Sequence, residues 1–292
     1  MKTRNCQIAI IGAGPAGSAA AIQLKRAGIN PIVFEKNKIG GLAVNANLIE
    51  NYIGFPQGID GKKFVSLLDE HFNSLVIDLI EEEIIDIDFE DEKFILKSNQ
   101  TICYSEYLII ATGTKSNPIN IKGMNKLVEK NLLFYEPINI PLEKLHKQQI
   151  AILGGGDAAF DYALNLVQNN NKIAIVHRNE IYSCLPLLYH RAINIEAIKL
   201  LAPKTISELQ IDDNSKVKII FDDESHIIVD YILVAFGREP NNELLKNLSR
   251  EILQNERLYQ IGDLVNGNFR QISIATGNGL QCAMDIIRKI NE

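Results

Sequence analysis

QIAIIGAGPAGSAAA, residues 7–21, is the stretch that decides the fold of this chain. Its apolar start predicts a buried parallel strand, and Gly12-x-Gly14-x-x-Gly17 opens an alanine-rich helix. The next predicted strand, PIVFE, ends on Glu35 at the spacing of an acid that binds a ribose. The three glycines permit a tight turn, close approach of the backbone to a pyrophosphate, and close packing of helix on strand. The stretch therefore predicts a dinucleotide at the helix N-terminus, against the alternative of a glycine turn without a ligand.

A second glycine-rich turn, GGGDAA over residues 154–159, follows the apolar run QIAIL and precedes a predicted helix and the strand KIAIV. This order predicts a second dinucleotide site. Where the first site has Glu35, the second has His177, followed by Arg178. An acid at this position favours NAD, whereas an arginine pairs with the 2′-phosphate of NADP. We therefore expect NADPH, with NADH or loss of nicotinamide binding as alternatives.

Further segments resemble a known family in the order in which they occur. Together with the two turns, the chain resembles over nearly its whole length a small flavoprotein of the thioredoxin reductase type, in the pyridine nucleotide-disulfide oxidoreductase superfamily. The segments are GGLAVNANLIENYIGFP at 40–56, LIIATGTKSNP at 108–118, AFGREPNN at 235–242 and YQIGDLVNGNFRQISIATGNG at 259–279.

The resemblance implies an α/β fold of two Rossmann-like, three-layer dinucleotide-binding domains, the second inserted in the first. An FAD-binding domain would comprise residues 1–114 and 240–292, and an NAD(P)-binding domain residues 115–239. The crossings near Thr112-Gly113 and Gly237-Arg238 are candidate hinges, since glycine tolerates the backbone change that domain rotation requires. The family resemblance also implies a homodimer.

The same resemblance implies the cofactor-binding residues. FAD would be held by Gly12, Gly14, Pro15, Ala16, Gly17, Glu35, Lys36, Gly41, Asn51, Ala111, Thr112, Gly113, Asp263, Arg270, Gln271 and Ile272. NAD(P) would be held by Gly154, Gly156, Asp157, Ala158, Ala159, His177, Arg178 and Gly237. A helix that starts near Gln271 beside Arg270 would stabilise the negative charge of reduced flavin, unless it is an ordinary C-terminal helix. Hydride passes between the cofactors themselves, so we expect no catalytic side chain.

The chain departs from thioredoxin reductases in its cysteines. These reductases have a CxxC pair shortly before the second glycine turn, but residues 131–149 contain no cysteine. The four cysteines, Cys6, Cys103, Cys184 and Cys282, are far apart in the sequence, so we expect no redox pair unless folding brings a distant cysteine in.

Without this pair, the chain is most similar to the thioredoxin-reductase-type ferredoxin or flavodoxin NAD(P)H reductases, in which an aromatic residue often lies near the flavin. Phe134 or Tyr135 could shield it, although a core role is favoured for each. A small-molecule acceptor remains an alternative, since no family-type tail follows the predicted helix over residues 281–289 to cover the flavin. The other alternative is a flavoprotein that has lost activity and serves as a binding module.

Composition limits the partners. The net charge of −6 and the pI near 5.5 disfavour nucleic acid. No apolar run has membrane-spanning length and no signal peptide is recognisable, so a cytoplasmic protein is expected. The five histidines are scattered without ligand spacing, which predicts no metal site.

The acidic run EEEIIDIDFEDEKFILKS at 81–98 predicts two alternating strands around a turn.

Overall fold

The computed structural model describes residues 1–141 and 144–292. The chain forms two compact units. Unit 1 comprises Met1–Val44, Ile49–Lys115 and Pro240–Glu292, and unit 2 comprises Asn45–Leu48 and Ser116–Glu239. The sequence placed the boundaries at 114/115 and 239/240, and the structure differs mainly in assigning 45–48 to unit 2. No helix of the described residues is long and apolar enough to cross a membrane.

Unit 1 is built on a seven-stranded sheet of order β3-β2-β1-β6-β5-β4, with β17 also paired to β6. The strands β1, β2, β3, β6 and β17 are parallel, as their apolar sequences predict. The bounds are β1 Lys2–Ile11, β2 Ile32–Phe34, β3 Asp78–Ile80, β4 Asp86–Glu90, β5 Lys93–Lys97, β6 Thr101–Ile110 and β17 Leu258–Gln260. The acidic run forms the antiparallel pair β4 and β5, so the two predicted strands are confirmed.

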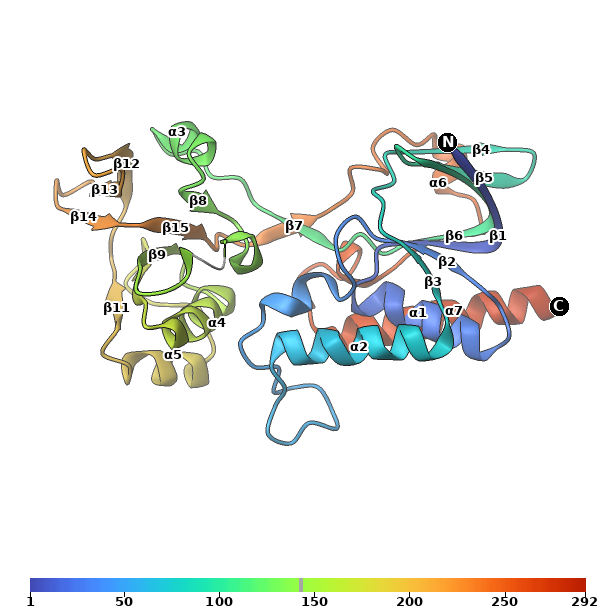
Figure 1. Ribbon diagram of the computed structural model, residues 1–292, viewed down its shortest axis with the longest axis horizontal. Helices are drawn as coiled ribbons and strands as arrows, with labels where there is room; N and C mark the ends of the chain where they lie inside the picture. Colours follow the sequence, from blue (N-terminus) through green and yellow to red (C-terminus); the bar gives the residue numbers. More distant parts are fainter. Residues whose placement is uncertain (142–143) are drawn as a thin grey trace. The chain divides into compact units, whose positions relative to one another are not determined.

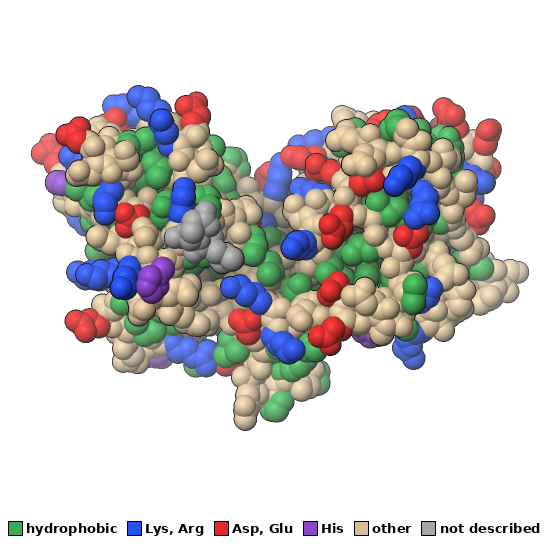
Figure 2. Space-filling model, in the orientation of Figure 1, with side chains coloured by type: hydrophobic (Ala, Val, Ile, Leu, Met, Phe, Trp, Pro, Cys, Tyr) green, Lys and Arg blue, Asp and Glu red, His purple; other side chains and the backbone are tan. Residues whose placement is uncertain are grey.

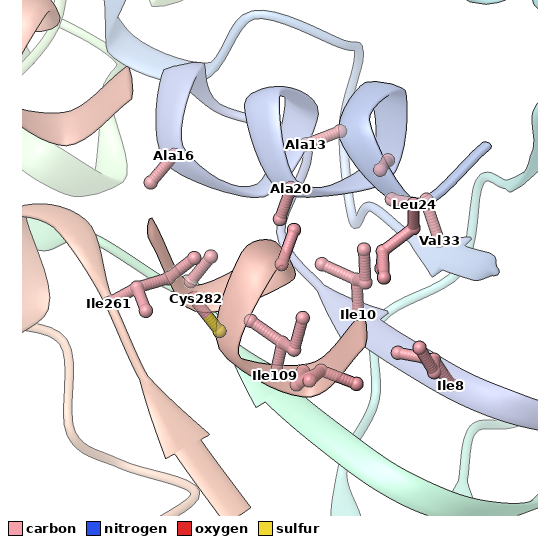
Figure 3. Close-up of a cluster of buried hydrophobic side chains, with 14 of the residues drawn as sticks. Ile8, Ile10, Ala13, Ala16, Ala20, Leu24, Val33, Ile109, Ile261 and Cys282 are labelled. Carbon is pink, nitrogen blue, oxygen red and sulfur yellow. The ribbon is translucent and has the colours of Figure 1, made fainter. Parts of the chain in front are cut away.

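The helices of unit 1 pack on its sheet through both small and large apolar side chains. Figure 1 shows α1, α2 and α7 together on one side of the parallel strands. The core beneath them combines Ile8 and Ile10 of β1 with alanines of α1 and with Cys282 of α7 (Figure 3). The helical segments are α1 Pro15–Arg26, η1 Gly41–Asn45, which ends in unit 2, α2 Gly61–Leu75, α6 Arg250–Leu253, η5 Gly262–Leu264 and α7 Ile272–Asn291.

Unit 2 has a parallel sheet of order β11-β10-β9-β15-β8 and a separate antiparallel sheet β12-β13-β14. Its strands are β8 Leu133–Phe134, β9 Gln149–Leu153, β10 Lys172–Val176, β11 Ile198–Leu201, β12 Ile206–Ile211, β13 Val217–Phe221, β14 His226–Val229 and β15 Tyr231–Val234. Its helical segments are α3 Met124–Glu129, η2 Pro137–Asn139, α4 Asp157–Leu166, η4 Val167–Asn169 and α5 Pro186–Ile193. This α/β arrangement agrees with the predicted fold class.

Two short strands carry the chain between the units. β7, Thr114–Ser116, pairs with β16, Arg238–Pro240, and a unit boundary falls inside each strand. Close by in unit 1, Thr112 Oγ1 donates to the Asn241 carbonyl at 2.8 Å, and the Asn241 N–H donates to Gly113 O at 2.9 Å. The predicted crossing residues therefore lie where the chain passes from one unit to the other.

Candidate functional site

The first glycine-rich turn connects β1 to α1 and leaves one open approach. Gly12 has φ +101°, and a Cβ there would lie 2.4 Å from Ala111 O. A Cβ on Gly17 would lie 1.9 Å from Gly12 O, so packing within the protein requires both glycines. A Cβ on Gly14 would meet nothing within 4 Å, and Gly41 lies beside it. Gly14 is thus the position where the backbone is open to a ligand.

The start of α1 fits a pyrophosphate. No side chain caps this helix, Pro15 is its first residue, and its first turn contains no acidic residue. Its N-terminal N–H groups and the positive end of its dipole therefore face the open approach at Gly14 with no carboxylate in the first turn of the helix. The residues of this turn fit the phosphates of FAD.

Glu35 is placed next to this turn. It follows β2 and is 9% exposed. Its Oε2 accepts from the Ala13 N–H at 2.8 Å and its Oε1 from the Asn37 N–H at 3.0 Å. The carboxylate is therefore held at the carboxyl end of the sheet, as a ribose-binding acid requires. The neighbouring Lys36 forms an exposed ion pair with Glu83 at 3.6 Å.

The start of α7 gathers residues that are far apart in the sequence. Asn51 Nδ2 donates to Gln271 Oε1 at 2.8 Å, and Ser273 Oγ donates to Asn51 O at 3.4 Å. Gln271 is the N-cap of α7, so the predicted helix start is confirmed. The amide nitrogen of Asn266, in the preceding loop, is buried and has no hydrogen-bond partner among the described residues. It is a donor that a bound flavin could use.

Two glycines that the sequence did not single out, Gly262 and Gly279, lie against Ala16 in the first turn of α1. Asp263 lies in η5, where Gly262 has φ +70° and a Cβ would come 2.7 Å from Ala16 Cβ. On α7, a Cβ on Gly279 would come 2.0 Å from Ala16 O. The close approach of α1 and α7 therefore depends on Gly279. The signal in the sequence was the set of small residues, Ala275, Gly279 and Ala283, spaced four apart along α7.

The second glycine-rich turn, between β9 and α4, is more enclosed than the first. Gly154 has φ +148°, and a Cβ there would lie 2.4 Å from Ala235 O. The Ser183 N–H donates to Gly155 O at 2.9 Å, and the Leu185 N–H donates to Asp157 Oδ1 at 2.7 Å. The segment after β10 thus folds back onto this turn. Room remains at Gly156, where a Cβ would be 3.7 Å from the nearest atom, Ser183 Oγ.

His177 and Arg178 have different surroundings at the end of β10. The His177 ring would lie 2.5 Å from a Cβ on Gly155 and is stacked on Tyr182, with ring centroids 5.3 Å apart. His177 therefore packs against the turn. Arg178 is exposed and has no ion pair among the described residues, so its guanidinium is available to a phosphate.

The other residues predicted to hold NAD(P) lie on two segments of unit 2. Ala158 and Ala159 are in the first turn of α4, and Gly237 lies beside Asn117.

Glu136 is the polar residue that the sequence analysis missed. It follows β8 at the carboxyl end of the unit 2 sheet, forms an ion pair with Arg238, and its side chain is 13% exposed. It also accepts from Ser116 Oγ at 3.0 Å, Asn45 Nδ2 at 2.9 Å and Tyr162 OH at 3.3 Å. Asn45, Ser116 and Arg238 each lie within two residues of a unit boundary. One carboxylate thus holds three crossings of the chain from the unit 2 side.

The two aromatic residues before Glu136, Phe134 and Tyr135, pack within unit 2. Phe134 is 8% exposed and packs edge-on against Tyr231, with ring centroids 6.0 Å apart. Tyr135 is partly buried and packs against a buried apolar cluster of unit 2 that includes Leu127, Leu133 and Ile232. Phe134 is therefore a core residue, the role that the sequence favoured for it.

Two cysteines come together, contrary to expectation. Cys6 Sγ and Cys103 Sγ are 3.7 Å apart, because β1 and β6 are neighbouring strands. The separation of 97 residues along the chain concealed this contact. Cys184 lies in the loop after β10, and burial and the Asp157 charge raise the pKa of its thiol. Among the described residues, no three histidine, cysteine or acidic side chains are placed to hold a metal ion.

Comparison with known proteins gives consistent matches. The family model described as "Pyridine nucleotide-disulphide oxidoreductase" matches residues 6–279. The thioredoxin reductase of Mycoplasma genitalium is 27% identical, with 96% of this chain and 93% of that protein covered. The bifunctional thioredoxin reductase/thioredoxin of Mycobacterium leprae is 26% identical over 98% of this chain, which spans only 66% of that relative. The fold matches thioredoxin reductase of Lactococcus lactis with TM-score 0.85 at 22% identity, covering 97% of this chain and 98% of that one.

Proposed function

The chain belongs to the pyridine nucleotide-disulphide oxidoreductase family, and from this premise we propose that its FAD passes electrons to a small protein carrier such as ferredoxin or flavodoxin. The family gives the reaction class: the protein is an FAD-dependent NAD(P)H oxidoreductase of the thioredoxin reductase type, and the expected cofactors FAD and NADPH are confirmed. When bound, FAD supplies hydride acceptance from the nicotinamide and release of the electrons to the next acceptor.

The observation that carries the proposal is the residue content of the loop after β8. Disulfide reduction requires a thiolate that reaches both the flavin and the substrate. This loop has Glu136, bound to Arg238, and residues 131–149 contain no cysteine. Cys282 lies on α7 and is buried in the core of unit 1, and burial raises the pKa of its thiol to about 12. Direct transfer from flavin to a carrier needs no thiol, which favours it.

The residues of this chain would act by binding and orientation. Gly14 and the start of α1 would receive the pyrophosphate of FAD, and Glu35 its ribose. Asn51 fixes the Gln271 side chain at the N-cap of α7, and the positive end of this helix favours negative charge on the flavin. The turn at Gly154 and Arg178 would hold NAD(P)H. On the face shown in Figure 2, acidic and basic side chains are interspersed in both units. A cytoplasmic location and a homodimer stay predictions.

The test is an anaerobic titration with NADPH and, separately, with NADH, followed by oxidised acceptors. We expect the flavin absorbance to be lost when either nucleotide is added. Addition of oxidised ferredoxin or flavodoxin should then reoxidise the flavin and restore the absorbance. Thioredoxin disulfide reduced at the same rate would contradict the proposal. Saturable turnover with a quinone or oxygen alone would favour the small-molecule alternative. Absence of bleaching by both nucleotides would favour the binding module.

Arg178→Ala tests the nicotinamide assignment. Removal of the exposed guanidinium should lower kcat/KM for NADPH about 10-fold and leave that for NADH unchanged, because one charge-assisted contact to the 2′-phosphate is lost. Glu180→Ala, in the same exposed loop, is the matched control and should keep the wild-type ratio. An unchanged NADPH to NADH ratio in Arg178→Ala would show that this residue does not contact the phosphate.

A further inference from the structure

Cys6 and Cys103 form a thiol pair in the sheet of unit 1. Their sulfur atoms are 3.7 Å apart. In the register of β1 and β6, Cys103 lies opposite Arg4 and Cys6 opposite Ser105, so the two cysteines are diagonal neighbours. Cys103 is fully buried, whereas Cys6 is half-buried. The pair therefore has one member enclosed by the core and one that solutes can approach.

The approach to Cys6 is a polar cleft of about 560 Å³. Arg4, Lys25 and Asp78 line it with Cys6, and Arg4 is paired with Asp78 at 2.9 Å. The cleft lies at the amino ends of the parallel strands, whereas the glycine-rich turn follows the carboxyl end of β1. Small polar solutes can reach the pair without entering the dinucleotide site.

The hydrogen bond between the two thiols shifts their pKa values in opposite directions. The hydrogen bond from Cys6 lowers the pKa of Cys103, against the effect of burial, and the Arg4 charge lowers it further. The same hydrogen bond raises the pKa of Cys6. Only the thiolate is nucleophilic, and the pair can supply one at Cys103, 3.7 Å from the Cys6 sulfur that borders the cleft.

We propose that Cys6 and Cys103 are an oxidisable dithiol that hydrogen peroxide converts to a disulfide between β1 and β6. One thiolate attacks a peroxide oxygen, the O–O bond breaks, and a sulfenic acid and hydroxide form; the hydroxide takes up the proton that the thiol released and becomes water. The second thiol attacks the sulfenic sulfur, the S–O bond breaks, the S–S bond forms and a second water leaves. In sum, two thiols are oxidised and one peroxide is reduced to two waters.

The sheet can accommodate this bond only with a small movement. The sulfurs must close from 3.7 Å to about 2.05 Å, and diagonal neighbours require a shift of the strand as well as side-chain rotation. The outer end of β1, Lys2–Asn5, is exposed and is the part best able to move. The disulfide would join residues 97 positions apart and so stabilise unit 1.

The experiment exposes the purified Cys184→Ser chain to hydrogen peroxide without NAD(P)H and examines its peptides by mass spectrometry. We expect loss of two thiols and a cross-linked peptide pair containing Cys6 and Cys103. The melting temperature should rise by at least about 3 °C and return to its original value after reduction with dithiothreitol. Cys6→Ser in the same background should show neither the cross-link nor the shift.

Two results would overturn the proposal: both thiols still free after treatment, or Cys6 oxidised to sulfinic acid with no link to Cys103. The cross-link in the Cys184→Ser chain is decisive whether or not the added Cys6→Ser change impairs folding. No nucleotide or acceptor takes part in the assay, so its failure leaves the proposed electron transfer untouched, and failure of that transfer leaves the dithiol untouched.

Discussion

Gly14→Ala should fold as well as the wild type and bind FAD about 100-fold more weakly. The expected loss, ~2.7 kcal/mol, is that of about two charge-assisted hydrogen bonds to the pyrophosphate. Gly14 has φ −70° and ψ −177°, which alanine adopts readily before a proline, and the added Cβ meets no protein atom within 4 Å. The methyl group therefore occupies space that only the ligand needs. FAD titration and melting of the apoprotein measure the two effects separately.

Two other glycine substitutions serve as controls. Gly279→Ala should destabilise the protein by about 3 kcal/mol, because its Cβ would lie 2.0 Å from Ala16 O and would force α1 and α7 apart. Gly277→Ala, on the same helix with nothing within 4 Å of the Cβ, should be neutral or slightly stabilising. If Gly14→Ala binds FAD normally, the pyrophosphate does not approach this turn.

Glu136→Ala should destabilise unit 2 by about 3 kcal/mol, since it removes the carboxylate from a mostly buried ion pair. The Glu136 and Arg238 side chains are 13% and 20% exposed, so solvent can replace little of the lost interaction. Ser116 and Asn45 lose an acceptor at the same time. Urea denaturation followed by circular dichroism would give the change in the free energy of unfolding.

A double-mutant cycle separates the ion pair from the other contacts of Glu136. Adding Arg238→Ala to Glu136→Ala should cost less than Arg238→Ala alone, because the cation has already lost its carboxylate. Lys115→Ala is the control: its ion pair with Glu243, 34% and 66% exposed, should contribute under about 1 kcal/mol. Additive effects in the cycle would show that Glu136 and Arg238 are not coupled.

Local sequence patterns predicted the parts of the fold that depend on near neighbours. The turn at Gly12, the strands around Asp91 and the start of α7 at Gln271 are each determined by alternation, periodicity or glycine within a few residues. The contact of Cys6 with Cys103 and the partners of Glu136 were not predictable, because strand order and chain crossings bring them together from distant positions. The placement of Asn45–Leu48 in unit 2 has the same origin.

The late position of α7 in the chain has a consequence for biosynthesis. A polypeptide emerges from the ribosome N-terminus first, at about 5–20 residues per second. α1 is made early, yet the surface at Ala16 and Ala19 that receives Gly279 stays uncovered until α7 has been synthesised. The nascent chain must carry this apolar surface while residues 116–239 are translated. We therefore expect chains truncated before α7 to be retained by chaperones or degraded.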